Sequence, residues 1–358
     1  MADKKSPGAL RAGLTAAGCF LGAGFVSGQE LWNFFGSYGV WGWAGLALAL
    51  IALSWFIRVM FDLVMDMGEP SILKTFVSFD CDWLRTVFFF LQFAFLVSVA
   101  MVMLAGSGTQ LSRMTGIPDW VGSTVVCGLG IAVTMSGLQG IMNIFSVTTP
   151  ILGVCTVGFG IYALTHTQTL AALLPQSGTA MPLAAAGSCL SYISYNILGP
   201  SSIIVQLGGR LKTRKAARLS PLLSGLILLP IACGVLVSML LNPEIVGSEI
   251  PMSDFAYTIH PAMGTVYGVL LLTGMFGCVI SCAVGASSAL FERFPQTEKH
   301  RNVIIPGMCL ICLAGSRVGF GNLISMLYPL FGKLNLVFLA TLLQHYFGRH
   351  RKKTEAPL

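Results

Sequence analysis

Charged residues are scarce in this chain. Only 10% of its 358 residues are Asp, Glu, Lys or Arg, whereas a typical soluble domain contains about 25%. Hydrophobic residues make up 55%, and the mean hydropathy is +0.79. A soluble fold of this size needs more charge to cover its surface. The composition therefore excludes a soluble globular enzyme, a disordered chain and a nucleic-acid-binding domain.

Patterns of catalytic or metal-binding residues are also missing from the sequence. It contains no phosphate-binding loop, no catalytic triad pattern and no cluster of His and Cys at ligand spacing. Cys309-x-x-Cys312 has the spacing of a redox or zinc motif, but it lies in an apolar run without a second pair, which favours small packing residues. We therefore predict that the chain is not an enzyme and that it holds no cofactor apart from a sodium ion.

Long apolar runs dominate the sequence instead. A helix needs about 20 apolar residues to cross a bilayer. The sequence predicts ten such spans, at residues 9–36, 41–65, 84–111, 118–136, 141–166, 183–208, 218–241, 260–291, 303–318 and 322–347. We therefore expect an all-α, multi-pass membrane protein whose partner is the lipid bilayer.

The basic residues predict the orientation of these spans. With the N-terminus inside, most of the 21 Lys and Arg residues fall in inside segments, and only Arg113 and Arg317 fall in outside loops. Lys and Arg concentrate on the cytoplasmic side of membrane proteins. Both termini, including a basic tail at 348–358, are therefore predicted to be cytoplasmic, and the net charge of +7 reflects topology rather than an anionic partner.

Ten spans divide into two sets of five within a single transporter domain, 1–358. The first set covers 9–166 and the second covers 183–347. Because five is odd, the second set crosses the membrane in the opposite sense, as in an inverted repeat.

Both sets begin with an interrupted span. Gly22, Gly24 and Gly28 weaken the first span, and Gly199-Pro200 removes a backbone donor from the sixth. Matched interruptions are typical of a binding site near the midplane of the membrane. Helix packing through small residues is the alternative interpretation.

Two segments resemble a known family. Gly22-Ala-Gly-Phe-Val-Ser-Gly-Gln-Glu30 and Tyr192-x-x-Tyr195-Asn196 are similar to the signature segments of the YkvI-type bacterial membrane permeases, within the amino acid–polyamine–organocation superfamily. The resemblance covers essentially the whole chain. It implies the leucine-transporter fold, with two inverted five-helix repeats and broken first and sixth helices, in a bacterial plasma membrane. It does not identify a substrate.

The interrupted spans supply the candidate substrate site. The free amides at the restart of the first span suit a carboxylate, while the sixth span adds aromatic rings and an amide. We predict a zwitterionic amino acid or a similar small carboxylate as substrate. The candidate substrate-binding residues are Gly22, Ala23, Gly24, Phe25, Val26, Tyr192, Tyr195, Asn196 and Gly199.

The resemblance also implies a sodium site. In sodium-coupled members of this fold, a hydroxyl pair on the eighth span meets backbone oxygens of the first. The corresponding ligands here are the side chains of Ser287 and Ser288 and the backbone oxygens of Val284, Gly18 and Leu21. A packing face of small residues is the alternative interpretation of the eighth span.

Polar residues within the membrane are candidates for gating and ion coupling. Gln29 and Glu30 follow the first interruption, and Lys333 lies in the tenth span. We predict that Glu30 and Lys333 form an outer gate pair or that Glu30 carries a coupling proton. The alternative is that each pairs separately for stability.

Together these features predict a secondary active transporter, a symporter coupled to sodium or to protons that works by alternating access. A nutrient sensor on the same fold and a channel are the alternatives. The oligomeric state is left open by the sequence.

Overall fold

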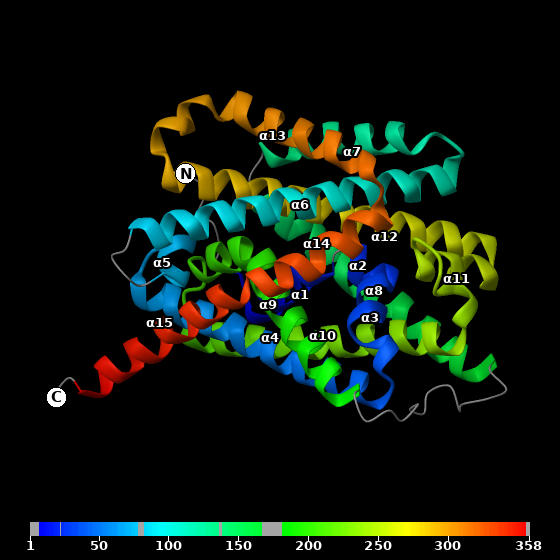
Figure 1. Cartoon of the computed structure of the whole chain (residues 1–358), viewed down its shortest axis with the longest axis horizontal. Helices are drawn as coiled ribbons and strands as arrows, with labels where there is room; N and C mark the ends of the chain where they lie inside the picture. Colours follow the sequence, from blue (N-terminus) through cyan, green and yellow to red (C-terminus); the bar gives the residue numbers. More distant parts are fainter. Residues whose placement is uncertain (1–6, 22, 78–81, 136–137, 167–180, 356–358) are drawn as a thin grey trace.

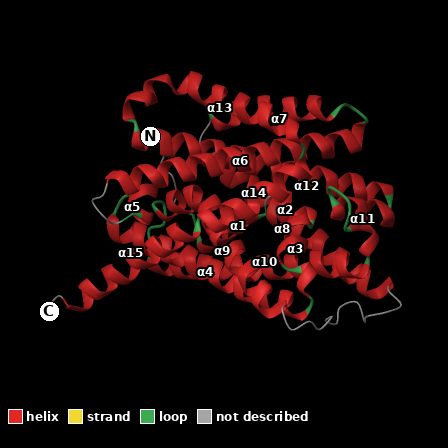
Figure 2. Ribbon diagram, viewed as in Figure 1, coloured by secondary structure: helices red, strands yellow, loops and turns green. Residues whose placement is uncertain are grey.

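The computed structural model describes residues 7–21, 23–77, 82–135, 138–166 and 181–355. Within these ranges the chain is helical, and it contains no strand (Figure 2). The all-α prediction is therefore confirmed for the described part of the chain.

The helices follow the predicted spans closely. In chain order they are α1 (Ala9–Phe20), α2 (Ala23–Ser27), α3 (Gln29–Phe34), α4 (Val40–Met67), α5 (Ile72–Phe76), α6 (Asp82–Thr115), α7 (Asp119–Thr134), α8 (Leu138–His166), α9 (Met181–Gly208), α10 (Arg214–Leu241), α11 (Pro251–Ile259), α12 (Pro261–Arg293), α13 (Arg301–Gly315), α14 (Phe320–Leu334) and α15 (Leu336–Glu355). Each predicted span overlaps at least one of these helices.

Seven helical segments in the described part of the chain are long and apolar enough to cross a membrane. Short polar side chains mark where several helices begin. The Oγ of Ser71 accepts the amide of Lys74 at the start of α5, and the Oγ1 of Thr213 accepts the amide of Ala216 at the start of α10. The membrane-protein prediction is confirmed, while the number of spans and the side of the termini stay predictions.

The long helices surround a central group of elements. Figure 1 shows α7 and α13 side by side along one face of the bundle and α4 and α10 toward the opposite face, with α1, α9 and α14 between them. Helices far apart in sequence are neighbours: α6 packs along α12, and α4 packs along α9. The elements that meet at the centre of the bundle are α1, α3, α6, α9, α12 and α14.

The first span is interrupted, as predicted. Its helix α1 ends at Phe20, and α2 ends at Ser27 because Gly28 adopts a φ of +92°, a left-handed conformation that disfavours side chains. A Cβ on Gly28 would also lie 2.4 Å from the sulfur of Met239. Glycine is thus favoured at this turn for two reasons: the backbone conformation is left-handed, and Met239 leaves no room for a side chain.

The predicted interruption of the sixth span is wrong. Helix α9 runs without a break from Met181 to Gly208 and contains Pro200 in its interior. The hydroxyl of Ser201 donates to the carbonyl of Leu198 at 2.6 Å. Within a helix, proline leaves the carbonyl four residues earlier, here that of Asn196, without its amide donor, and a membrane helix tolerates this loss where neighbouring groups or a local adjustment satisfy the backbone.

Candidate functional site

A small cavity lies at the centre of the bundle, beside the interrupted first span. It has a volume of about 40 Å³ and is lined by α1, α3, α6, α9, α12 and α14. This is room for a few water molecules. Because its walls come from both halves of the chain, the cavity is the candidate functional site.

Glu30 supplies the acidic group of this cavity. Its side chain is only 2% exposed, and its Oε1 accepts a hydrogen bond of 3.2 Å from the Nδ2 of Asn196. The same amide nitrogen also donates to the carbonyl of Tyr192 one turn earlier in α9, which fixes the orientation of the amide. Among the residues that line the cavity there is no Lys, Arg or His.

Gly24 gives the Glu30 carboxyl its place. A Cβ on residue 24 would lie 2.6 Å from the Oε2 of Glu30 and 3.3 Å from the ring of Tyr328. The short helix α2 therefore packs its glycine directly against the carboxyl, and any larger residue would displace it.

Aromatic rings enclose the acid. Tyr195 stacks on Tyr328 with ring centroids 4.7 Å apart and lies 6.1 Å from the parallel ring of Phe34. Phe95 meets Tyr195 edge to face at 5.8 Å. Tyr195, Tyr328 and Glu30 all line the same cavity. The cavity therefore combines one carboxyl with the faces and edges of several rings.

One hydroxyl in the cavity wall has no partner of its own. The Oγ of Ser281 on α12 is buried and makes no hydrogen bond with the described residues, although Ser281 lines the cavity. A buried hydroxyl without a partner is uncommon, and a ligand or a water molecule would satisfy it. It is an additional polar group available to a bound solute.

Two hydrogen bonds tie the interrupted span to distant parts of the chain. The hydroxyl of Tyr267 on α12 donates to the carbonyl of Val26 at 2.7 Å, and the Nε2 of Gln29 donates to the carbonyl of Ser248 at 2.9 Å. Interrupted helices expose backbone carbonyls that need such partners. Gln29 is thus placed to link α3 to the loop before α11.

The structure brings together only part of the predicted substrate site. Of the predicted substrate-binding residues, the cavity wall includes Tyr195, Asn196 and Gly199, and they are joined there by Glu30, which was predicted for gating or coupling. The remaining predicted residues that are described, Gly24, Phe25, Val26 and Tyr192, lie behind the wall in the buried core.

Two of the predicted residues cannot be placed against the cavity. Gly22 and the side chain of Ala23 lie outside the described residues. The predicted use of the free amides where the first span restarts, near Val26 to Gly28, also stays a prediction.

The structure does not assemble the predicted sodium ligands. The carbonyl oxygen of Leu21 lies 3.5 Å from the position of a Cβ on Gly274. Ser287 is thirteen residues further along α12, or about 20 Å at 1.5 Å per residue.

Each of the predicted ligand atoms other than the carbonyl oxygen of Leu21 already has a hydrogen-bond partner within the protein. The hydroxyl of Ser287 donates to the carbonyl of Val284 at 3.1 Å, and Ser288 accepts from the Nε2 of Gln206 at 3.4 Å. The carbonyl of Gly18 accepts the amide of Leu21 at 3.2 Å. The assignment of these five residues to one sodium site is therefore wrong, because the register along α12 separates them.

The predicted gate pair is also wrong in this structure. Lys333 is exposed, whereas Glu30 is buried, and the hydrogen bond of the carboxyl goes to Asn196. Helix α14 instead turns Tyr328 toward Glu30. Five residues separate Tyr328 from Lys333, which places the two side chains on different faces of the helix.

Sequence reasoning missed several residues of the site. They include Phe95 on α6, Tyr328 on α14, and Cys278 and Ser281 on α12. None belongs to a recognisable motif, and an aromatic or thiol residue in an apolar span is ordinarily interpreted as packing.

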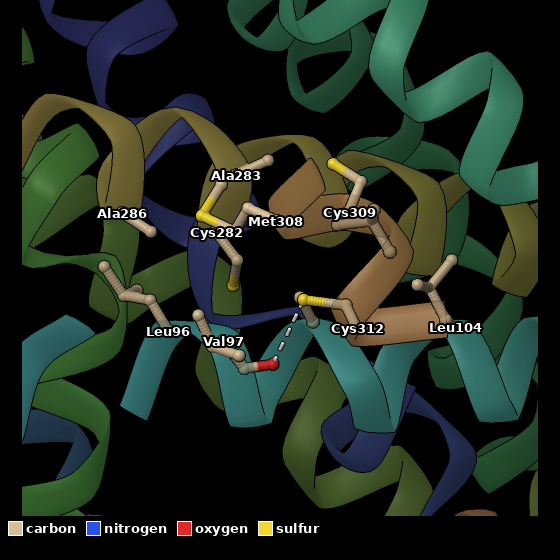
Figure 3. A pocket seen from close by; sticks show the side chains of 11 residues that line it. Leu96, Val97, Leu104, Cys282, Ala283, Ala286, Met308, Cys309 and Cys312 are labelled. Carbon is tan, nitrogen blue, oxygen red and sulfur yellow. Dashed lines mark hydrogen bonds between the residues drawn. The ribbon is translucent and has the colours of Figure 1, made fainter. Parts of the chain in front are cut away.

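A second, narrower cavity contains the Cys309-x-x-Cys312 pair. Figure 3 shows Cys282, Cys309 and Cys312 around it, with the thiol of Cys312 donating to the carbonyl of Val97 at 3.6 Å. The cavity holds about 10 Å³ and has no polar lining side chain apart from the thiols. Both cysteines are buried, as expected of packing residues.

The chain is similar to two proteins of Bacillus subtilis (strain 168). It is 28% identical over 344 residues to the uncharacterized protein YyaD, covering 92% of this chain and 94% of that protein. It is 24% identical over 338 residues to the uncharacterized membrane protein YkvI, covering 93% and 95%. The resemblance to YkvI is therefore confirmed across nearly the whole chain. No protein-family model matches this chain.

Solved structures with the same fold are transporters. The manganese transporter of Eremococcus coleocola superposes with a TM-score of 0.64 at 13% identity, covering 96% of this chain and 81% of that chain. Mhp1 in its inward-facing conformation gives a TM-score of 0.57 at 14% identity, covering 96% and 77%. These neighbours confirm the overall fold expected from the resemblance, whereas the implied break of the sixth helix is absent from α9 and the inverted repeat stays a prediction. The neighbours are transporters rather than enzymes.

Proposed function

We propose that this chain is a secondary transporter that moves a small amino-containing solute by alternating access, with an amino acid as the favoured substrate. The observation that carries the proposal is a buried carboxyl, Glu30, in a central cavity of a transporter fold. Ionisable groups buried in membrane proteins are typical of substrate and ion pathways.

The charge of the cavity favours an amino group as the part of the solute that Glu30 binds. A carboxylate in an apolar site is stabilised by an opposite charge, and none of the described residues that line the cavity is basic. An ammonium group can bind the carboxyl and also lie over the rings of Tyr195 and Tyr328. The amide of Asn196 holds the carboxyl in place for this contact.

The size of the cavity supports alternating access. At about 40 Å³ it is too small for an amino acid, so substrate entry requires its walls to separate. The walls come from both halves of the chain: the interrupted first span and α6 from the first, and α9, α12 and α14 from the second. In transporters built from two repeats, one repeat moves against the other around the site. Because the interruption at Gly28 lies beside the site, it is a natural hinge.

The coupling ion is a separate part of the proposal. Among the described residues, Glu30 is the candidate proton carrier, since buried carboxyl groups form proton relays in transporters. Sodium remains an alternative at a ligand set other than the one the sequence suggested. Symport with either ion is the mode we propose.

Three measurements test this function. A thermal-shift screen of amino acids, amines and carboxylates identifies the ligand, because a ligand that binds the folded state raises its apparent stability. Uptake of that ligand into proteoliposomes is then measured under a proton gradient, a sodium gradient and neither. Binding without uptake under every gradient would instead indicate a sensor, and single-channel currents would indicate a channel.

Glu30→Gln separates the role of the acid from folding. The variant keeps the shape of the side chain and an oxygen that accepts from Asn196, but it removes the charge. We expect uptake to fall at least tenfold, with Glu298→Gln as the matched control, since Glu298 is an exposed glutamate outside the site. Uptake equal to that of the unmodified protein would refute the assignment of Glu30.

A further inference from the structure

A groove on the outer surface of the bundle lies between α4 and α10, well away from the central cavity. It has a volume of about 410 Å³, and most of its lining is apolar. Its walls include Ile51 and Leu226, which are 69% and 66% exposed. An exposed apolar groove of this kind faces the lipid bilayer in a membrane protein.

The floor of the groove is formed by a close approach of the two helices. A Cβ on Gly225 would lie 2.2 Å from the Oγ of Ser54, so only glycine allows this contact. On either side of the contact the larger side chains of Trp55 and Leu222 stand outward. The groove is thus a fixed feature of the helix packing.

Both basic residues of the groove lie at the same end. Arg58 is the last residue that α4 contributes, and Arg218 is the first that α10 contributes. The two helices run antiparallel here, since Ser54 lies against Gly225 and Asp66 near the end of α4 pairs with Arg214 at the start of α10, so both arginines lie toward the same end of the groove. The result is an apolar channel that ends in two guanidinium groups.

Neither arginine is fully neutralised by the protein. Arg218 is exposed and forms no ion pair with the residues that the structure describes. Arg58 is 47% exposed, and its Nε lies 3.7 Å from the Oδ2 of Asp62, a long separation for an ion pair. The acid one turn further on, Asp66, pairs with Arg214 instead.

We propose that this groove, the α4–α10 groove, binds an anionic phospholipid of the bilayer. The phosphate contacts Arg58 and Arg218, and an acyl chain lies along the apolar walls toward Leu229. Charge complementarity selects this occupant, since basic pockets between membrane helices bind anionic headgroups and arginine matches the geometry of phosphate. The orientation predicted from the basic residues places the headgroup in the cytoplasmic leaflet.

The test uses the intrinsic fluorescence of the full-length protein. Trp55 lines the groove, so a phospholipid with brominated acyl chains quenches it on binding. The purified protein is titrated with brominated phosphatidylglycerol and, separately, with brominated phosphatidylcholine in the same detergent. We expect tighter binding of phosphatidylglycerol, by roughly fivefold for each arginine at low salt.

Substitutions assign the preference to the groove. Arg218→Gln breaks no ion pair of the described structure and is expected to reduce the preference for phosphatidylglycerol by roughly fivefold. Arg218→Lys keeps the charge and should retain most of the preference for phosphatidylglycerol. Lys215→Gln removes an equal charge from an exposed position outside the groove and should leave the preference unchanged.

Several outcomes would overturn the proposal. Equal quenching by the two lipids would do so, and so would an identical loss in Lys215→Gln, which would indicate the general surface charge. Displacement of the brominated lipid by inorganic phosphate alone would show that the acyl chain contributes nothing. A Trp55→Phe variant that keeps all of the arginine-dependent quenching would place the lipid elsewhere on the protein.

Discussion

Gly24→Ala is the most informative single substitution, because it acts on the position of the Glu30 carboxyl without removing it. The new Cβ would lie 2.6 Å from the Oε2 of Glu30, closer than two unbonded atoms can approach. Since the new methyl group also lies 3.3 Å from the ring of Tyr328, the carboxyl must move away from α2. We expect that movement to break the hydrogen bond of 3.2 Å that the Oε1 of Glu30 accepts from Asn196.

The expected loss of substrate affinity is estimated from the loss of that hydrogen bond. A hydrogen bond to a charged group contributes about 1.5–3 kcal/mol. If substrate binding depends on the oriented carboxyl, affinity should fall by roughly 10- to 150-fold, because about 1.4 kcal/mol corresponds to a factor of ten. The assay is the dissociation constant of the ligand found in the thermal-shift screen, together with its uptake into proteoliposomes.

Gly187→Ala is the matched control for this substitution. Gly187 lies in α9, and a Cβ there would meet nothing within 4 Å. Alanine in a helix interior is slightly favoured over glycine, so this variant should bind and transport normally. Equal affinities of Gly24→Ala and Gly187→Ala would refute the placement of the carboxyl against α2.

Three further substitutions probe the parts of the site that the structure reassigns. The double variant Ser287→Ala with Ser288→Ala should leave the sodium dependence of uptake unchanged within about twofold, because the hydroxyls bond within α12 and to α9. Lys333→Gln should show a coupling energy with Glu30→Gln below about 0.5 kcal/mol in a double-mutant cycle of ligand binding, and a larger value would restore the gate pair. Tyr267→Phe removes the bond to the backbone of α2 and should lower the free energy of unfolding by about 1–3 kcal/mol, measured in mixed micelles; no change would mean that this bond does not hold the interrupted span.

Short-range features of the sequence predicted much of the fold. The apolar runs predicted helices at every span, because a bilayer imposes a minimum length of apolar helix. The glycines between residues 22 and 28 predicted the interruption of the first span, because a left-handed turn such as the one at Gly28 requires glycine. Glu30 was identified because an acid in an apolar span is rare wherever it occurs.

The sequence alone was less informative about the sixth span. Pro200 predicted an interruption, yet whether a helix continues through a proline depends on whether neighbouring groups satisfy the backbone. Beside the proline, the hydroxyl of Ser201 donates to the carbonyl of Leu198, which Pro200 does not deprive of its amide, and also accepts from Gln92 on α6, which ties this turn to a neighbouring helix. That second contact joins residues 109 positions apart and is invisible to local pattern analysis.

The partners of Glu30 were decided only by the tertiary structure. The sequence indicated that this acid needs a partner, but charge alone suggested Lys333, and helix phase instead points Tyr328 at the cavity. Asn196 reaches the carboxyl from 166 residues away, and Ser287 misses the first span by about 20 Å along its helix. Composition and local pattern determined that this chain lies in a membrane with an acid at a helix interruption, whereas packing register determined what surrounds that acid, because register depends on contacts between helices that no single segment encodes.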